Sequence, residues 1–99
     1  MDIADWRKRI DELDSKLVEL ISERAQCATE IGKLKHGLAM AIYEPDRERL
    51  IYENIARQNP GPLSDKQLRQ IYERLIDVMR EIQKVEMAPE KAAELEPKE

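Results

Sequence analysis

Arg24 interrupts a row of apolar side chains at helical spacing, and a guanidinium at such a position requires an acidic partner. Apolar residues recur every three or four positions from Trp6 to Leu38. Arg24 fills the step between Leu20 and Cys27. Arginine keeps its charge when it is buried, so that charge must be matched. The residues leave two partners open: a glutamate of a neighbouring helix, as in a structural ion pair, or a bound anion.

Two more basic residues of the same segment bear on the second possibility. At about 100° per residue, Lys35 lies only about 20° from Arg24 around a helix, so both side chains face the same side. Arg7 lies about 25 Å from Arg24 along the axis, too far for one small ligand to contact both. If two chains pair their long helices antiparallel, Arg7 of one chain approaches Arg24 of the other and completes a cationic pocket. The alternative for Arg7 and Lys35 is a solvated surface charge.

Polar groups suited to such a pocket also occur later in the chain. Glu44-Pro45-Asp46-Arg47-Glu48 is a charge-dense helix start, where Arg47 and the helix N-terminus suit an anionic ligand, although it can equally be a solvated first turn. Gln83 lies at the edge of an apolar helix face, where its amide is either a solvent-exposed polar group or a hydrogen-bond donor into a pocket. The sequence offers no obvious nucleophile, metal-ligand spacing or phosphate-binding loop beside these groups. The sequence therefore predicts no metal site, and the missing nucleophile is a clue to the mechanism.

The first of the helices that must position these residues is very long. Its periodicity predicts a helix from about Ile3 to about Lys35, capped by Asp2 or Asp5 and stopped at His36-Gly37. The composition, with 38% charged and 4% aromatic residues and no Phe, also favours helices over a sheet.

Two more helices follow. After an apolar connector (38–44), a second helix is predicted over 45–58, and a break rich in Pro and Gly comes next. Ser64 and Gln67 then form a capping box for a third helix, which ends before Pro89. The predicted fold class is all-α, with helices in the order long, short, long.

The first helix is too long to be covered within one chain. The partner helices have about 14 and about 23 residues, so the apolar stripe of a helix of about 30 residues extends beyond them. A second copy with the long helices paired across a two-fold axis is the simplest solution. We expect an obligate or near-obligate homodimer.

Charge and cysteine content narrow the classes of function. The net charge of −4 argues against nucleic acid as a partner, and a single cysteine excludes an intramolecular disulfide. No apolar run reaches the length of a membrane span, and the first residues include acids rather than an apolar signal core. We expect a cytoplasmic protein without a membrane partner. Residues 1–87 are expected to form the helical domain, and 88–99 a disordered acidic tail or the stub of a linker.

Several short patterns occur together over residues 5–85. They are Arg7-x-x-Ile10-Asp11-x-x-Asp14, Leu20-Ile21-x-Glu23-Arg24, Ile31-Gly32-x-x-Lys35, Tyr43-Glu44-Pro45-Asp46-Arg47-Glu48 and, in the last helix, Gln83. In this order and spacing they resemble the all-helical chorismate mutases, small intertwined dimers of the shikimate pathway of aromatic amino acid biosynthesis. The resemblance implies two chains of three helices that interlock around the first helix. It also implies an isomerase that converts chorismate to prephenate by a Claisen rearrangement, without covalent catalysis and without a cofactor.

The resemblance also assigns catalytic roles. Arg24 would hold one substrate carboxylate, and Arg7 of the other subunit would hold the second. Lys35 would reach the ether oxygen and a carboxylate. Gln83 would donate its amide to the same ether oxygen, where negative charge grows in the transition state.

The remaining substrate-binding positions follow from the second and third helices. Arg47 would lie beside the side-chain carboxylate, and Glu48 would accept a hydrogen bond from the ring hydroxyl. Glu44, where the family often has Asp, would act through its backbone near that hydroxyl. Met79 departs from the pattern, because many relatives carry a small hydroxyl residue there. This departure puts one polar contact to a carboxylate in doubt.

Three other functions remain compatible with the sequence. An isochorismate pyruvate lyase shares the fold and much of the cationic pocket. A regulatory domain of a larger aromatic-pathway enzyme is the second, in which case the tail is a linker. The third is a helical dimerisation module without a ligand.

Overall fold

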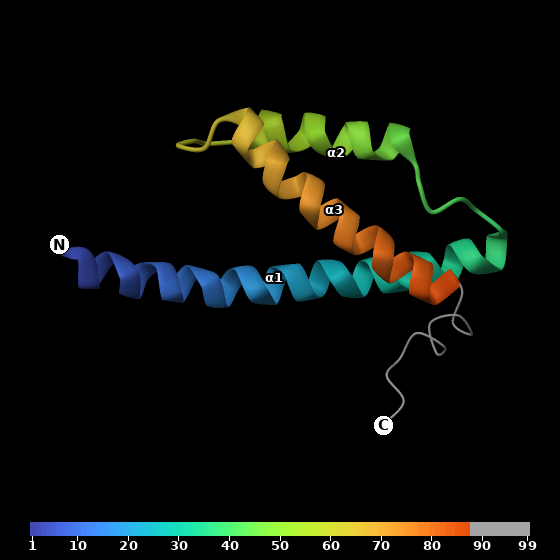
Figure 1. Cartoon of the computed structure of the whole chain (residues 1–99), viewed down its shortest axis with the longest axis horizontal. Helices are drawn as coiled ribbons and strands as arrows, with labels where there is room; N and C mark the ends of the chain where they lie inside the picture. Colours follow the sequence, from blue (N-terminus) through green and yellow to red (C-terminus); the bar gives the residue numbers. More distant parts are fainter. Residues whose placement is uncertain (88–99) are drawn as a thin grey trace, which may run out of the picture.

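The computed structural model describes residues 1–87, which contain three helices joined by non-helical segments (39–44 and 59–64) (Figure 1). Helix α1 spans Ile3–Leu38, α2 spans Pro45–Gln58 and α3 spans Asp65–Met87. The predicted all-α fold with a long, a short and a long helix is confirmed. The predicted tail (88–99) lies outside the described residues.

The helix starts follow from local capping. The Asp2 carboxylate accepts a hydrogen bond from the amide of Asp5, and the Asp5 carboxylate accepts one from the amide of Asp2, both at 3.0 Å. Pro45 occupies the first turn of α2, where its missing N–H leaves no bond unmade. The Ser64 hydroxyl accepts a hydrogen bond from the backbone amide of Gln67 at 3.1 Å, and Oε1 of Gln67 accepts one from the backbone amide of Ser64 at 3.0 Å. All three starts confirm the prediction.

The end of α1 differs from the prediction. The stop expected at His36-Gly37 is wrong, because Gly37 keeps a helical backbone and the helix continues to Leu38. The chain leaves the helix at Ala39, whose φ of 54° lies in the left-handed region. The amide of Met40 donates to the Lys35 carbonyl at 2.9 Å, so a backbone hydrogen bond closes the last turn. These bonds do not require glycine, although a left-handed alanine costs roughly 1–2 kcal/mol.

Helix α3 holds the three helices together. It crosses the C-terminal half of α1 and packs on α2, while the N-terminal half of α1 projects beyond the crossing (Figure 1). Ala28 and Gly32, four residues apart on one face of α1, are buried, and Ile76 and Met79 of α3 are buried as well. Small residues on α1 allow the close approach of a second helix.

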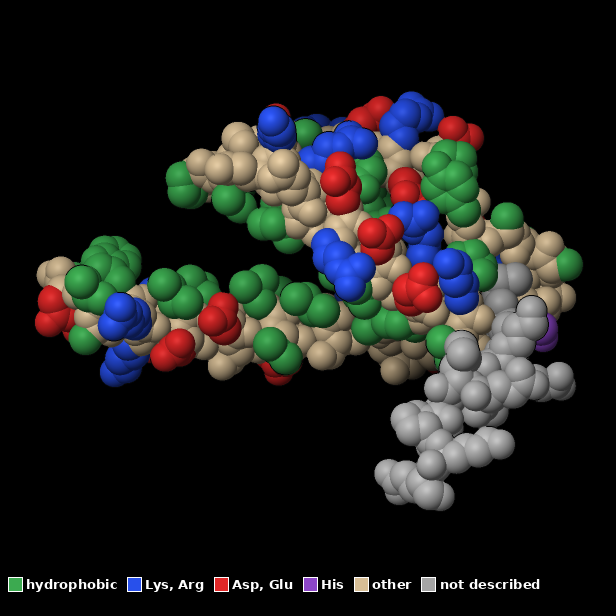
Figure 2. Space-filling model, in the orientation of Figure 1, with side chains coloured by type: hydrophobic (Ala, Val, Ile, Leu, Met, Phe, Trp, Pro, Cys, Tyr) green, Lys and Arg blue, Asp and Glu red, His purple; other side chains and the backbone are tan. Residues whose placement is uncertain are grey.

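The projecting half of α1 leaves its apolar side chains exposed. Along it, apolar side chains form a row that faces the gap below α2 (Figure 2). The exposed fractions are 56% for Trp6, 53% for Ile10, 40% for Leu13, 52% for Leu17 and 61% for Leu20. Within residues 1–87, the stripe thus extends beyond the helices that one chain provides to cover it, as predicted. None of the helices within residues 1–87 has a stretch long and apolar enough to cross a bilayer.

Candidate functional site

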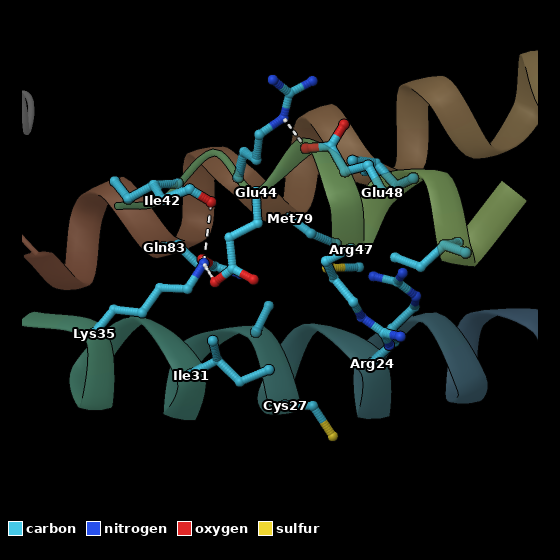
Figure 3. Close-up of a pocket in the computed structure, with 14 residues that line it drawn as sticks. Arg24, Cys27, Ile31, Lys35, Ile42, Glu44, Arg47, Glu48, Met79 and Gln83 are labelled. Carbon is cyan, nitrogen blue, oxygen red and sulfur yellow. Dashed lines mark hydrogen bonds and ion pairs between the residues drawn. The ribbon is translucent and has the colours of Figure 1, made fainter. Parts of the chain in front are cut away.

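A cavity of about 340 Å³ lies where α1, α3 and the start of α2 meet (Figure 3). Its walls contain Arg24, Cys27, Ala28, Ile31 and Lys35 from α1, Ile42 and Glu44 from the connector, Arg47, Glu48 and Ile51 from α2, and Ile76, Met79, Arg80 and Gln83 from α3. Every site residue predicted from the sequence lines this cavity except Arg7. Segments far apart in the chain therefore line one cavity, and its lining contains both charged and apolar side chains.

Lys35 carries a buried positive charge at one end of the cavity. The residue is only 6% exposed. Its Nζ lies 3.0 Å from the carbonyl oxygen of Ile42, 2.9 Å from Oε1 of Gln83 and 2.9 Å from Oε1 of Glu44. An ammonium group has three donors, and these three acceptors match them. The contacts join the C-terminal part of α1 to the connector and to α3.

The contact with Lys35 also fixes the orientation of the Gln83 amide. Lysine can only donate, so the oxygen of the amide must be the atom that faces Nζ. The amide nitrogen then keeps two N–H donors for other partners. Figure 3 shows Gln83 beside Lys35 and Glu44, with Met79 farther along the same wall.

Arg24 and Arg47 provide positive charge at the other end of the cavity (Figure 3). Arg24 is half-buried and Arg47 is exposed. Within residues 1–87 of one chain, neither guanidinium forms an ion pair with a carboxylate. Among the described residues of one chain, the structural ion pair considered for Arg24 is therefore not made. Two cations from different helices around one cavity favour an anion that neutralises both.

The carboxylates of the cavity are both paired with basic side chains. Glu44 contacts Lys35 through its side chain, a contact that the backbone role implied by the resemblance did not include. Glu48 lies 3.6 Å from Nε of Arg80, with 17% of its side chain exposed. The lining thus carries four basic and two acidic side chains, a net charge of 4 − 2 = +2. That charge complements a ligand with two carboxylates.

Sequence reasoning missed Arg80, and it did not name Ala28 or Ile76, which belong to the apolar lining. Arg80 follows the buried Met79 and precedes the acidic Glu81, so it reads as one of many charged residues at the edge of α3. Only the fold brings it to Glu48. Ala28 had one usable signal, a small residue four positions before Gly32 on a long helix.

Arg7 lies outside the cavity, on the exposed N-terminal part of α1. This placement agrees with the prediction that Arg7 and Arg24 of one helix cannot contact the same small ligand. Among residues 1–87, no three or more His, Cys, Asp or Glu side chains gather in a way that could hold a metal ion.

Comparison with known proteins adds independent information. A family model described as chorismate mutase type II matches residues 6–84. A bifunctional chorismate mutase/prephenate dehydratase from Pseudomonas aeruginosa is 39% identical over 75 residues, which cover 71% of this chain and 20% of that protein. A chorismate mutase from Methanocaldococcus jannaschii is 40% identical over 55 residues, 56% of each chain.

A solved structure agrees over a larger share of the chain. The form II structure of chorismate mutase from Thermus thermophilus aligns with a TM-score of 0.81 at 28% identity, covering 83% of this chain and 93% of that one. By contrast, this chain matches about a fifth of the length of the bifunctional relative and about half of the archaeal one.

Proposed function

Since the chain belongs to the chorismate mutase type II family, we propose that it catalyses the rearrangement of chorismate to prephenate. The observation that carries the proposal is the cavity itself. It places an ammonium and an amide at one end, and at the other two guanidinium groups that have no carboxylate partner within residues 1–87. As part of aromatic amino acid biosynthesis, the reaction is expected to take place in the cytoplasm.

The reaction needs few chemical functions from the protein. In the substrate, an ether oxygen joins a ring to an enolpyruvyl group, and each part bears a carboxylate. The ether C–O bond breaks while a C–C bond forms between the two parts, and no proton is transferred. A protein accelerates such a step by holding the compact conformer and by stabilising the negative charge that grows on the ether oxygen.

Lys35 and Gln83 are the proposed donors to that oxygen. Gln83 keeps two amide N–H groups, and Lys35 gains a donor when one of its present partners leaves. Glu44 is the partner expected to leave, because 39% of its side chain is exposed and water can receive its carboxylate. The buried position of Lys35 makes its charge more effective than it would be in water.

Arg24 and Arg47 are proposed to bind the substrate carboxylates, and Glu48 to accept a hydrogen bond from the ring hydroxyl. Arg7 of a second copy is proposed to complete the site. The exposed apolar stripe of α1 supports a homodimer, because burying it against a partner helix removes large apolar side chains from water. Met79 offers no hydroxyl, so the polar contact of many relatives is expected to be absent here.

The chain is also proposed to work beside or within a larger aromatic-pathway enzyme. The relative from Pseudomonas aeruginosa is bifunctional, and this chain matches only 20% of its length. A second catalytic domain on the same polypeptide or in a complex would consume the product.

Product identification tests the proposed activity. The protein is incubated with chorismate at neutral pH, and the products are followed by proton NMR. We expect prephenate as the product. Unchanged chorismate would refute the proposal, and release of pyruvate from isochorismate in a parallel sample would favour the lyase instead.

A further inference from the structure

Arg80 is a basic residue of the cavity to which the proposed mechanism gives no role. It lies on α3, one residue after Met79, and 32% of its side chain is exposed. Its three polar or aromatic neighbours come from three parts of the chain. Nε lies 3.6 Å from Oε2 of Glu48 on α2, Nη2 lies 2.5 Å from Oδ1 of Asp77 on α3, and the guanidinium carbon lies 5.5 Å from the ring centre of Tyr43 in the connector.

The buried Nε of Arg80 has Glu48 as its charged neighbour. This nitrogen is inaccessible to solvent and makes no hydrogen bond within residues 1–87. The distance to Glu48 is that of an ion pair but exceeds the 2.7–3.2 Å of a hydrogen bond. A buried donor without an acceptor is unfavourable, so a small movement of the Glu48 carboxylate toward Nε is favourable. The dashed line at Glu48 in Figure 3 marks this pair.

We infer that Arg80 is a positioning residue for Glu48, an inference that rests on the proposed function. Glu48 is an acidic group in a cavity that must accept a ligand with two negative charges. Without Arg80 its carboxylate would repel that ligand and would be free to rotate. Arg80 offsets the charge and holds the carboxylate where the ring hydroxyl can donate to it. Arg80 does not touch the substrate in this account.

The stacking on Tyr43 extends the effect to the connector. Tyr43 directly precedes Glu44, and Glu48 lies in the first turn of α2. Arg80 therefore ties α3 to both sides of the point where the chain enters α2. The attraction between the Arg80 cation and the Tyr43 ring is weak, and it acts together with the ion pair to Glu48.

A kinetic double-mutant cycle tests the inference. Arg80→Met is expected to raise KM for chorismate about tenfold and to change kcat less than about threefold, because the lost charge balance acts on substrate binding. In a Glu48→Gln background the same change should alter KM less than about twofold, since no carboxylate remains to be held. A tenfold effect in both backgrounds, or no effect in either, overturns the inference.

Two further variants test whether the effect of Arg80 on KM comes from its contact with Glu48 rather than from a folding defect or from the loss of any positive charge on α3. Arg80→Lys keeps a positive charge but loses the contacts with Asp77 and the Tyr43 ring, so its KM should lie between those of the wild type and Arg80→Met. Lys84→Met removes one charge from the next turn of α3, where the side chain is 59% exposed and pairs with Glu81. Its KM should remain at the wild-type value, and a tenfold rise there would overturn the inference.

A measurement without substrate distinguishes this inference from the proposed function. The ¹³C signal of the Glu48 side-chain carboxyl carbon should shift in Arg80→Met and remain in place in Lys84→Met. An unmoved signal in Arg80→Met overturns the inference even if the protein is inactive. A shifted signal in a protein that leaves chorismate unchanged supports the pair and refutes the mutase activity instead.

Discussion

Replacing Lys35 by methionine removes a buried charge from the cavity and keeps the unbranched side chain up to the ammonium nitrogen. Lys35 is 6% exposed, and its ammonium contacts the Ile42 carbonyl, Gln83 and Glu44 at 3.0, 2.9 and 2.9 Å. An electrostatic donor in such a site contributes about 2.7–4 kcal/mol to the transition state. We therefore expect kcat/KM for chorismate to fall by about 10²- to 10³-fold.

The same substitution is expected to leave the protein folded. The Ile42 carbonyl and the Gln83 oxygen each lose a donor, at a cost of about 1–3 kcal/mol for a buried group. The ammonium no longer has to be desolvated, which offsets part of that cost. Glu44 can turn to water because 39% of its side chain is exposed. The free energy of unfolding should thus fall by less than the about 2–6 kcal/mol that the two lost donors would cost alone.

Steady-state kinetics and circular dichroism check both expectations. The matched control is Lys33→Met, because Lys33 lies on the same helix, 55% exposed, and pairs with Glu30 outside the cavity. The control should keep wild-type activity. If Lys35→Met retained activity within about tenfold of the wild type, or if both variants lost activity equally, the role assigned to Lys35 would be wrong.

Three other predictions follow from the site and its surroundings. Gln83→Glu should be active only at acidic pH, because the introduced carboxyl donates to the ether oxygen only when protonated and loses that ability as the pH rises; a pH profile parallel to that of the wild type would remove Gln83 from the mechanism. Arg47→Ala should lower kcat/KM at least tenfold, whereas Arg49→Ala, which removes a 63% exposed side chain paired with Glu53, should leave kcat/KM unchanged. Equal effects of the two substitutions would contradict the proposed contact between Arg47 and the substrate. Leu17→Glu should convert a dimer to monomer in sedimentation equilibrium and abolish turnover, and a folded, active monomer of the wild type would contradict the shared site.

Helix positions and the polar residues of the cavity other than Arg80 were predictable because their signals are local. Apolar periodicity places Arg24 and Lys35 on one face of α1 whatever the rest of the chain does. The Ser64–Gln67 capping box marks the start of α3 in the same way. The resemblance supplied the roles, and the fold brought the residues to one cavity.

The contacts that the sequence did not reveal depend on tertiary packing. The end of α1 at Leu38 is closed by backbone hydrogen bonds that do not require glycine, so the Gly37 signal was misleading. The side chain of Glu44 reaches Lys35 only because the connector folds back over α1. Arg80 meets Glu48 because α3 packs on α2, and no spacing within one helix records that pairing.

Mixing two inactive variants tests the central claim, that one substrate is held by Arg24 of one chain and Arg7 of another. Arg7→Ala and Arg24→Ala are each expected to lose at least about a hundredfold in turnover of chorismate. When equal amounts are unfolded and refolded together, half of the dimers contain one chain of each kind, and one of their two sites has both arginines. The mixture should therefore recover about a quarter of the wild-type rate of prephenate formation. A mixture as inactive as its two components, while mixed dimers are present, would contradict the claim.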